Sequence, residues 1–192
     1  DGAGYVITGN GLGYGINDSA GFDNITVKNF AGINNFTNGI YWLHTIDSAI
    51  YNNTIISANL SYGHGINLVN SSGNNVSLNN ITGLGARGYG ITGGGTSFGN
   101  NTILSNTIMT SKRGIYAFGI YISGGSGNNT ISYNNISTFT YRAYPLLIEG
   151  SANYYNTLSF NRISSGTEIK LTSANNIVSS NTVSSTIDVS SS

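Results

Sequence analysis

Carboxylates are the first residues in this chain that could do chemistry, and there are few of them. The sequence holds seven acidic residues, seven basic residues and two histidines. Hydrolysis of a glycoside needs two carboxyl groups, one of which holds a proton. Only Asp18, Asp23 and Asp47, with His44 nearby, form an acidic cluster along the chain. Their oxygens suit a hard cation, which makes them a candidate Ca²⁺ site; the alternative is three solvated acids that favour turns.

The basic residues offer one further kind of chemistry, the removal of a proton by a lyase. Arg87, Lys112, Arg113 and Arg142 are expected in loops, where they would form a thin basic stripe with no acids opposite. No phosphate-binding loop, nucleophile elbow or Cys/His constellation is present. The sequence therefore favours a non-catalytic protein over an enzyme, and it predicts no catalytic residue and no cofactor other than Ca²⁺.

The sequence contains a repeat of about 25 residues, and the elements of this repeat must position any functional residues. Its most regular motif is apolar-x-x-Asn-x-apolar, for example Ile131 to Ile136. In the first copy, Ile25 to Phe30, Lys28 takes the Asn place. The Asn column of the other copies reads Asn53, Asn79, Asn106, Asn134, Asn161 and Asn181.

A second column lies about ten residues before each motif. Its first five members are Gly-Ile pairs, and an aromatic residue or His64 often precedes the glycine. All apolar segments alternate with a period of two, which indicates strands. The column reads Ile16, Ile40, Ile66, Ile91, Ile120, Leu146 and Ile169.

Three short strands in each repeat indicate one coil of a parallel β-helix. Consecutive coils would stack at about 4.8 Å. We predict an all-β, right-handed parallel β-helix of about seven coils, forming one domain over residues 1–192. The coils would occupy about residues 5–183, and a C-terminal strand and tail would follow at 184–192.

The Asn column is expected to form a ladder at the sharp turn between the second and third strands. Asn tolerates the left-handed backbone conformation, and its amide has both donors and an acceptor. Stacked in register, the amides can bond to one another and to turn backbone. His64, in the aromatic column, is expected to stack on its neighbours, and Tyr41 and Tyr121 are expected to face outward.

On these motifs, the chain resembles the right-handed parallel β-helix repeat proteins of the pectate-lyase-like group. It looks most like the NosD-like and the archaeal or bacterial surface β-helix proteins. The resemblance covers residues 5–183 and implies the fold, with a third turn of variable length. The fold hosts lyases, hydrolases and epimerases that act on polysaccharides, so it does not imply one function.

The amino-acid composition limits the classes of partner that the protein is expected to bind. The formal net charge is zero and only 7% of residues are charged, so nothing points to nucleic acid or an anionic membrane. No apolar run approaches the roughly 20 residues of a membrane span. Low charge, abundant Ser, Thr and Asn, and no Cys are typical of extracellular and cell-surface proteins.

Asn-x-Ser/Thr sequons are only modestly enriched. Asn52 completes one but is expected to point inward. The better glycosylation candidates are expected in loops or on outward faces. They are Asn17, Asn35, Asn59 and Asn70.

Two hypotheses for function follow. The first is a non-catalytic extracellular structural or adhesive module, which self-associates or joins neighbouring β-helix domains. Because Val6 and Ile7 match third-strand positions and "TIDVSSS" looks like another first strand, we expect end-to-end stacking into a filament or adjoining domains. The second is a β-helix that binds glycans or degrades a polysaccharide.

Overall fold

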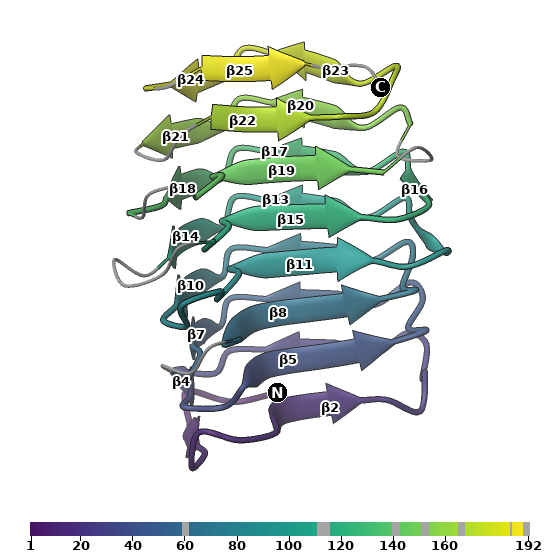
Figure 1. Cartoon of the computed structure of the whole chain (residues 1–192). Coiled ribbons are helices and arrows are strands. Elements are labelled where there is room, and N and C mark those ends of the chain that lie inside the picture. Colours follow the sequence, from purple (N-terminus) through teal and green to yellow (C-terminus); the bar gives the residue numbers. More distant parts are fainter. Residues whose placement is uncertain are drawn as a thin grey trace.

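The computed structural model describes residues 1–58, 62–110, 116–139, 143–150, 154–164, 168–184 and 186–189. Every element in these ranges is a strand and none is a helix. Three parallel sheets stack as a β-solenoid, in which the chain runs along the front, passes behind and climbs in a right-handed sense (Figure 1). The predicted all-β parallel β-helix is confirmed.

Sheet 1 contains the first strand of each coil and faces the viewer in Figure 1. Its eight strands are paired in parallel between successive coils. They are β2 (Tyr14–Asp18), β5 (Asn38–Leu43), β8 (His64–Val69), β11 (Ile91–Gly94), β15 (Ile120–Ser123), β19 (Leu146–Glu149), β22 (Glu168–Leu171) and β25 (Thr186–Val189).

Sheet 2 contains the second strands. Its seven strands are β3 (Thr26–Lys28), β6 (Ala49–Tyr51), β9 (Asn75–Ser77), β13 (Thr102–Leu104), β17 (Thr130–Ser132), β20 (Thr157–Ser159) and β23 (Ile177–Ser179). From β3 to β23 the chain makes about six turns, slightly fewer than the seven coils counted in the sequence, because six full turns connect the seven stacked strands of sheet 2.

Sheet 3 contains the third strands. Its eight strands are β1 (Val6–Thr8), β4 (Gly32–Asn34), β7 (Thr54–Ile56), β10 (Asn80–Gly83), β14 (Thr107–Thr110), β18 (Asn135–Ser137), β21 (Arg162–Ser164) and β24 (Thr182–Val183). A separate pair, β12 (Phe98–Gly99) and β16 (Ser126–Gly127), lies between sheets 1 and 2. We call the connection from sheet 1 to sheet 2 turn 1, that from sheet 2 to sheet 3 turn 2, and that back to sheet 1 turn 3.

Isoleucine columns fill the interior. In sheet 1, Ile40, Ile66, Ile91 and Ile120 pair in register, and all four are fully buried. Each such side chain contributes about 1.5–3 kcal/mol by leaving water. β-branched residues suit this arrangement because their stiff side chains pack well on a pleated surface. The period-two pattern of the sequence thus places the core as predicted.

The predicted Asn ladder runs along turn 2. Asn106, for example, donates from Nδ2 to Asn134 Oδ1 at 3.0 Å and to the Val76 carbonyl at 2.9 Å. Its own Oδ1 accepts the backbone N–H of Asn79 at 3.0 Å. All members except Asn181 are almost fully buried. Each amide therefore forms hydrogen bonds with backbone groups of the turn, which would otherwise be buried without partners.

Two details of the predicted ladder are wrong. One extra residue lengthens turn 2 of the first coil, so Val27 pairs with Ile50, and Phe30, not Lys28, follows the bend. The backbone N–H of Phe30 donates to Asn53 Oδ1 at 3.1 Å and so begins the ladder. The left-handed residue is also not the ladder Asn but the one before it, such as Asn52 with φ of 54°.

A second Asn ladder, not foreseen from the sequence, runs along turn 1. Ser48 donates its backbone N–H to Asn74 Oδ1 at 2.9 Å, and Asn74 donates its own to Asn101 Oδ1 at 3.0 Å. The ladder continues through amide contacts of 2.9–3.2 Å. Its members are Asn74, Asn101, Asn129, Asn156 and Asn176.

The glycine column before the sheet 1 isoleucines is required by close packing. A Cβ added at Gly90 would lie 2.3 Å from Ile108 Cγ2 and 2.6 Å from the Gly119 carbonyl oxygen. Gly39 and Gly65 meet the equivalent atoms of their own neighbours at similar distances. The absence of a side chain at these glycines thus leaves room for the isoleucine of sheet 3 and for the backbone of the next coil.

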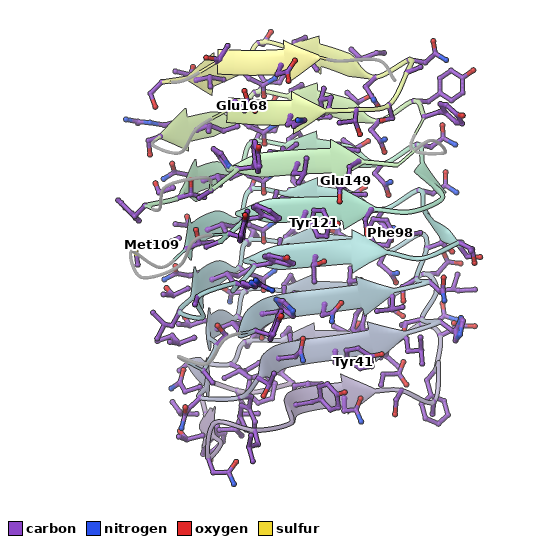
Figure 2. All side chains as sticks on the ribbon, in the orientation of Figure 1. Tyr41, Phe98, Met109, Tyr121, Glu149 and Glu168 are labelled. Atoms are coloured by element: carbon purple, nitrogen blue, oxygen red, sulfur yellow. The ribbon has the colours of Figure 1, made fainter. Side chains whose placement is uncertain are left out.

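Gly93 and Phe98 form one packing unit, and this leads to a first prediction. Phe98 is fully buried, and a Cβ at Gly93 would lie 2.2 Å from its ring (Figure 2). The same inward column holds Leu68 and Ile122 in the adjacent coils. We expect Gly93→Leu to destabilise the fold by about 3 kcal/mol through overpacking.

Phe98→Ala should also cost about 3–5 kcal/mol because it leaves a cavity. The double variant should recover part of both losses, since the leucine side chain introduced by Gly93→Leu would occupy the space of the ring. Chemical denaturation of the four proteins measures this coupling. Strictly additive losses would show that the two residues pack independently.

Candidate functional site

An aromatic cluster on the outer side of sheet 1 is the most developed feature outside the core. His64, Tyr89 and Phe118 stack on consecutive coils, with ring centroids 4.7 and 4.9 Å apart. Tyr144 continues the column at 5.6 Å from Phe118. Tyr121 on β15 packs its ring against both Tyr89 and Phe118, at 5.2 and 5.4 Å. We call these five residues the aromatic face; the expected stacking of His64 is confirmed.

The Gly-Ile pair explains why the rings emerge on the outside. Gly65 and Ile66 both direct substituents inward, because a Cβ at Gly65 would meet Ile81. The residue before this pair is therefore turned outward, beside the side chains that alternate along the strand. Tyr41 packs in the same way on Tyr14, 4.6 Å away, as expected for an outward position.

Two charged side chains flank the aromatic face. Tyr121 donates its hydroxyl hydrogen to Glu149 Oε1, and Figure 2 shows the two side by side on neighbouring strands. Burial, and then this hydrogen bond, raise the pKa of Tyr121 to about 12. At the other edge, Arg87 donates to the Tyr62 hydroxyl at 2.8 Å and lies over the Tyr116 ring at 5.8 Å. The face thus carries rings, phenol hydroxyls, a cation and a carboxylate within a few coils.

His64 links this face to the pH dependence of stability. Burial lowers the pKa of its imidazole from 6.5 to about 4, and Nδ1 accepts a hydrogen bond from the Tyr89 backbone N–H. Between these values the unfolded chain is protonated and the folded protein is not. The stability from neutral His64 is therefore complete above pH 6.5 and is lost as the pH falls to 4, by at most about 3 kcal/mol.

We expect His64→Phe to remove this component, and the ring should fit because Phe118 occupies the same column two coils further on. Free energies of unfolding at pH 7.5 and pH 4.5 should differ more for the wild type than for the variant. All other ionisable groups are common to the two proteins, so the difference between the two profiles isolates His64. Parallel profiles for the two proteins would contradict the assignment.

The three acids proposed for Ca²⁺ lie at turn 1 of the first two coils. Asp18 is buried, and accepts from the Gly21 and Phe22 backbone and from the Thr45 hydroxyl. Asp23 accepts the Ile46 N–H at 2.8 Å. Asp47, with φ of 49°, is a left-handed residue of turn 1 in the second coil. Among the residues that the structure describes, no three His, Cys, Asp or Glu side chains form a group that could hold a metal ion.

The described glycosylation candidates lie at turns or, for Asn17, on strand β2. Asn17 is exposed and donates to Ser19 Oγ at 3.3 Å. Asn35 is exposed but donates to the Gly9 carbonyl, and Asn70 accepts the Thr96 N–H. Asn59 lies outside the described residues. Asn52, expected to point inward, is exposed instead, because it is the left-handed residue before the ladder.

Of the predicted basic stripe, only Arg87 falls within the described ranges, where it contacts aromatic rings. Lys112, Arg113 and Arg142 lie outside them. The Arg87 contacts were missed in the sequence, because turn 3 varies in length and gives no register for its side chains. The Glu149 contact was missed because it depends on the register between β15 and β19. Tyr121 and the aromatic column were the usable signals.

In the described part of the chain, no helix is long and apolar enough to cross a membrane. No protein-family model, curated protein or solved structure matches the chain. The structure itself shows a parallel β-solenoid with buried asparagine ladders, which is the fold that the resemblance to β-helix repeat proteins implies.

Proposed function

We propose that this chain is a non-catalytic structural and adhesive module of an extracellular surface, which contacts carbohydrate through its aromatic face. The observation that carries the proposal is the set of stacked rings held over coils of sheet 1 between Arg87 and Glu149. The half-buried rings of this face offer apolar contact to the C–H edges of sugars, while Phe118 is buried and supports them from the centre of the stack. The phenol, guanidinium and carboxylate groups offer hydrogen bonds to hydroxyls.

The rest of the molecule suits a rigid support. The two Asn ladders form buried hydrogen bonds at the turns, and the glycine column allows successive coils to pack closely. A site on strands is held more firmly than one on loops. The low charge and the exposed sequon residue Asn17 support an extracellular location, which protease treatment of intact source cells would test.

A glycan array of neutral and acidic polysaccharide fragments tests the adhesive role. We expect binding that Tyr121→Ala weakens by about tenfold, because it removes one ring and the partner of Glu149. Tyr155→Ala is the matched control, since Tyr155 is exposed at turn 1, away from this face. Equal binding by both variants would remove the aromatic face from the proposal.

Polysaccharide degradation is the competing function for the same fold. It predicts turnover that Asp23→Ala or Asp47→Ala abolishes. Asp23 instead accepts a backbone hydrogen bond from the next coil, and Asp47 occupies a left-handed position of turn 1, so both residues have a structural use.

A further inference from the structure

The bends at the two turns use different kinds of residue. In each coil, one residue with positive φ lies immediately before the ladder position of turn 1, and another lies immediately before the ladder position of turn 2. In turn 1 this residue is Asn, Asp or Gly in six coils of seven, as backbone preference predicts. In turn 2 it is Asn only in the first two coils. The next five coils place Leu78, Ser105, Tyr133, Phe160 and Ser180 there, and we call these five residues the turn-2 ridge.

Three members of the ridge are unfavourable for an isolated coil on two counts. A left-handed backbone is disfavoured for bulky side chains, and Leu78, Tyr133 and Phe160 adopt it with φ of 55–56°. The same three side chains are 62, 57 and 51% exposed. Their described ring contact is the stacking of Tyr133 on Phe160, at 4.9 Å and 8°. Strained, exposed apolar residues in one line point to a contact made outside the coil.

The order of large and small side chains along the ridge would let it fit against the same ridge of a second copy that runs in the opposite direction. Backbone hydrogen bonds place the five residues on successive coils. Read from the N-terminal end, the sizes run large, small, large, large, small. A second ridge running the other way sets each small serine opposite a large side chain, with Tyr133 at the centre. Such self-complementarity is the property of a two-fold, isologous contact.

We propose that the turn-2 ridge pairs two copies of this chain side by side and antiparallel. Phe160 of one copy would lie over Ser105 of the other, Leu78 over Ser180, and the two Tyr133 rings would meet at the two-fold axis. No ridge residue is charged, so no repulsion opposes the pairing. The contact is separate from the aromatic face, because the ridge lies where sheets 2 and 3 meet, whereas that face belongs to sheet 1.

The size of the ridge limits the strength of the pair. Three half-exposed side chains of this kind present on the order of 300–400 Å² per copy. A stable protein interface buries about 1,200–2,000 Å² in total, which is more than two such ridges supply. We therefore expect a weak dimer that forms at high local concentration, as when many copies are displayed on one surface.

Cysteine cross-linking tests the geometry, since the sequence contains no cysteine of its own. With a short bis-maleimide, Tyr133→Cys should cross-link to itself. An equal mixture of Ser105→Cys and Phe160→Cys should give the mixed dimer in preference to either self-dimer. Asn100→Cys is the matched control, because Asn100 is an exposed left-handed residue of turn 1.

Cross-linking of Asn100→Cys equal to that of Tyr133→Cys would overturn the proposal. So would self-linking of Ser105→Cys in excess of the mixed product, because that result requires parallel copies.

Sedimentation of an unlinked variant gives a second test. Replacing Leu78, Tyr133 and Phe160 by Asn should keep the fold at or above the wild-type melting temperature, because Asn suits the left-handed bend. This variant should sediment as a monomer at concentrations where the wild type forms dimers, and it should retain any glycan binding at the aromatic face.

A wild type that stays monomeric up to its solubility limit would overturn the pairing, as would a variant that still dimerises. Loss of glycan binding in the variant without any change in oligomeric state would assign the ridge to a sugar instead. Failure of the carbohydrate proposal would be seen in a separate result, namely glycan binding that Tyr121→Ala leaves unchanged.

Discussion

Asn134→Ala is expected to destabilise the protein by about 4 kcal/mol, a large part of the stability of a domain this size. The Asn134 amide donates to the carbonyls of Ile103 and Ser132 and to Asn161 Oδ1, all within 3.0 Å. Its Oδ1 accepts two bonds from Asn106. Removing it leaves several buried groups without partners, each at a cost of about 1–3 kcal/mol.

Asn135→Ala is the natural control, because the two asparagines are adjacent in the sequence. Asn134 is buried and Asn135 is exposed. The control should change the free energy of unfolding by no more than about 0.5 kcal/mol. Urea denaturation of both variants gives the comparison, and losses of similar size would refute the ladder as a source of stability.

Gly90→Ala is expected to have the second largest effect, a loss of at least about 3 kcal/mol. The new methyl group would overlap Ile108 and the Gly119 carbonyl, both fixed by the packing of coils. Overpacking a rigid site typically costs about 1–3 kcal/mol, and a clash with backbone belongs at the upper end or beyond. Thermal unfolding followed by circular dichroism measures it.

Gly83→Ala serves as the control for this prediction. Gly83 is also a buried strand glycine, but a Cβ there would meet nothing closer than 3.4 Å. Its replacement should shift the melting temperature little. If both variants melt alike, the glycine column reflects something other than close approach of the coils.

The fold could be predicted because the strongest signals are local and repeated. The isoleucine columns and the turn-2 Asn column need only a constant distance between a strand and its bend. The turn-1 ladder has the same residues, in the second Asn of pairs such as Asn128-Asn129, but turn 1 differs in length between coils. Counted from the turn-2 ladder, however, the spacing is constant, because each turn-1 ladder Asn lies five residues before the turn-2 Asn of its coil, as Asn129 does before Asn134. The sequence therefore carried this signal, but those asparagines were interpreted as the end of a turn that leads into the second strand.

The bend itself was misjudged for a physical reason. Asn was assigned to the left-handed position because it tolerates that conformation, yet a residue that must bury its amide cannot also point outward from the bend. The preceding residue takes the left-handed conformation, and Tyr133 or Phe160 can do so. That exchange is visible only once the backbone is known.

Some residues of the aromatic face and its surroundings could likewise be predicted from the sequence, and others could not. The column that contains His64 and Tyr89 was evident, because it precedes the regular Gly-Ile pair. The flanking Arg87 comes from turn 3, whose length changes from coil to coil. Glu149 follows regular strand positions, but only the three-dimensional register sets it beside Tyr121.

The most direct test of the adhesive role is a titration of the best array glycan with the wild-type protein at pH 7, with release of new sugar ends followed in the same sample. The proposal predicts saturable binding that leaves the glycan intact. Absence of binding to every glycan tested would contradict it. Cleavage of the glycan that Asp23→Ala abolishes would contradict it equally, and would make the protein an enzyme.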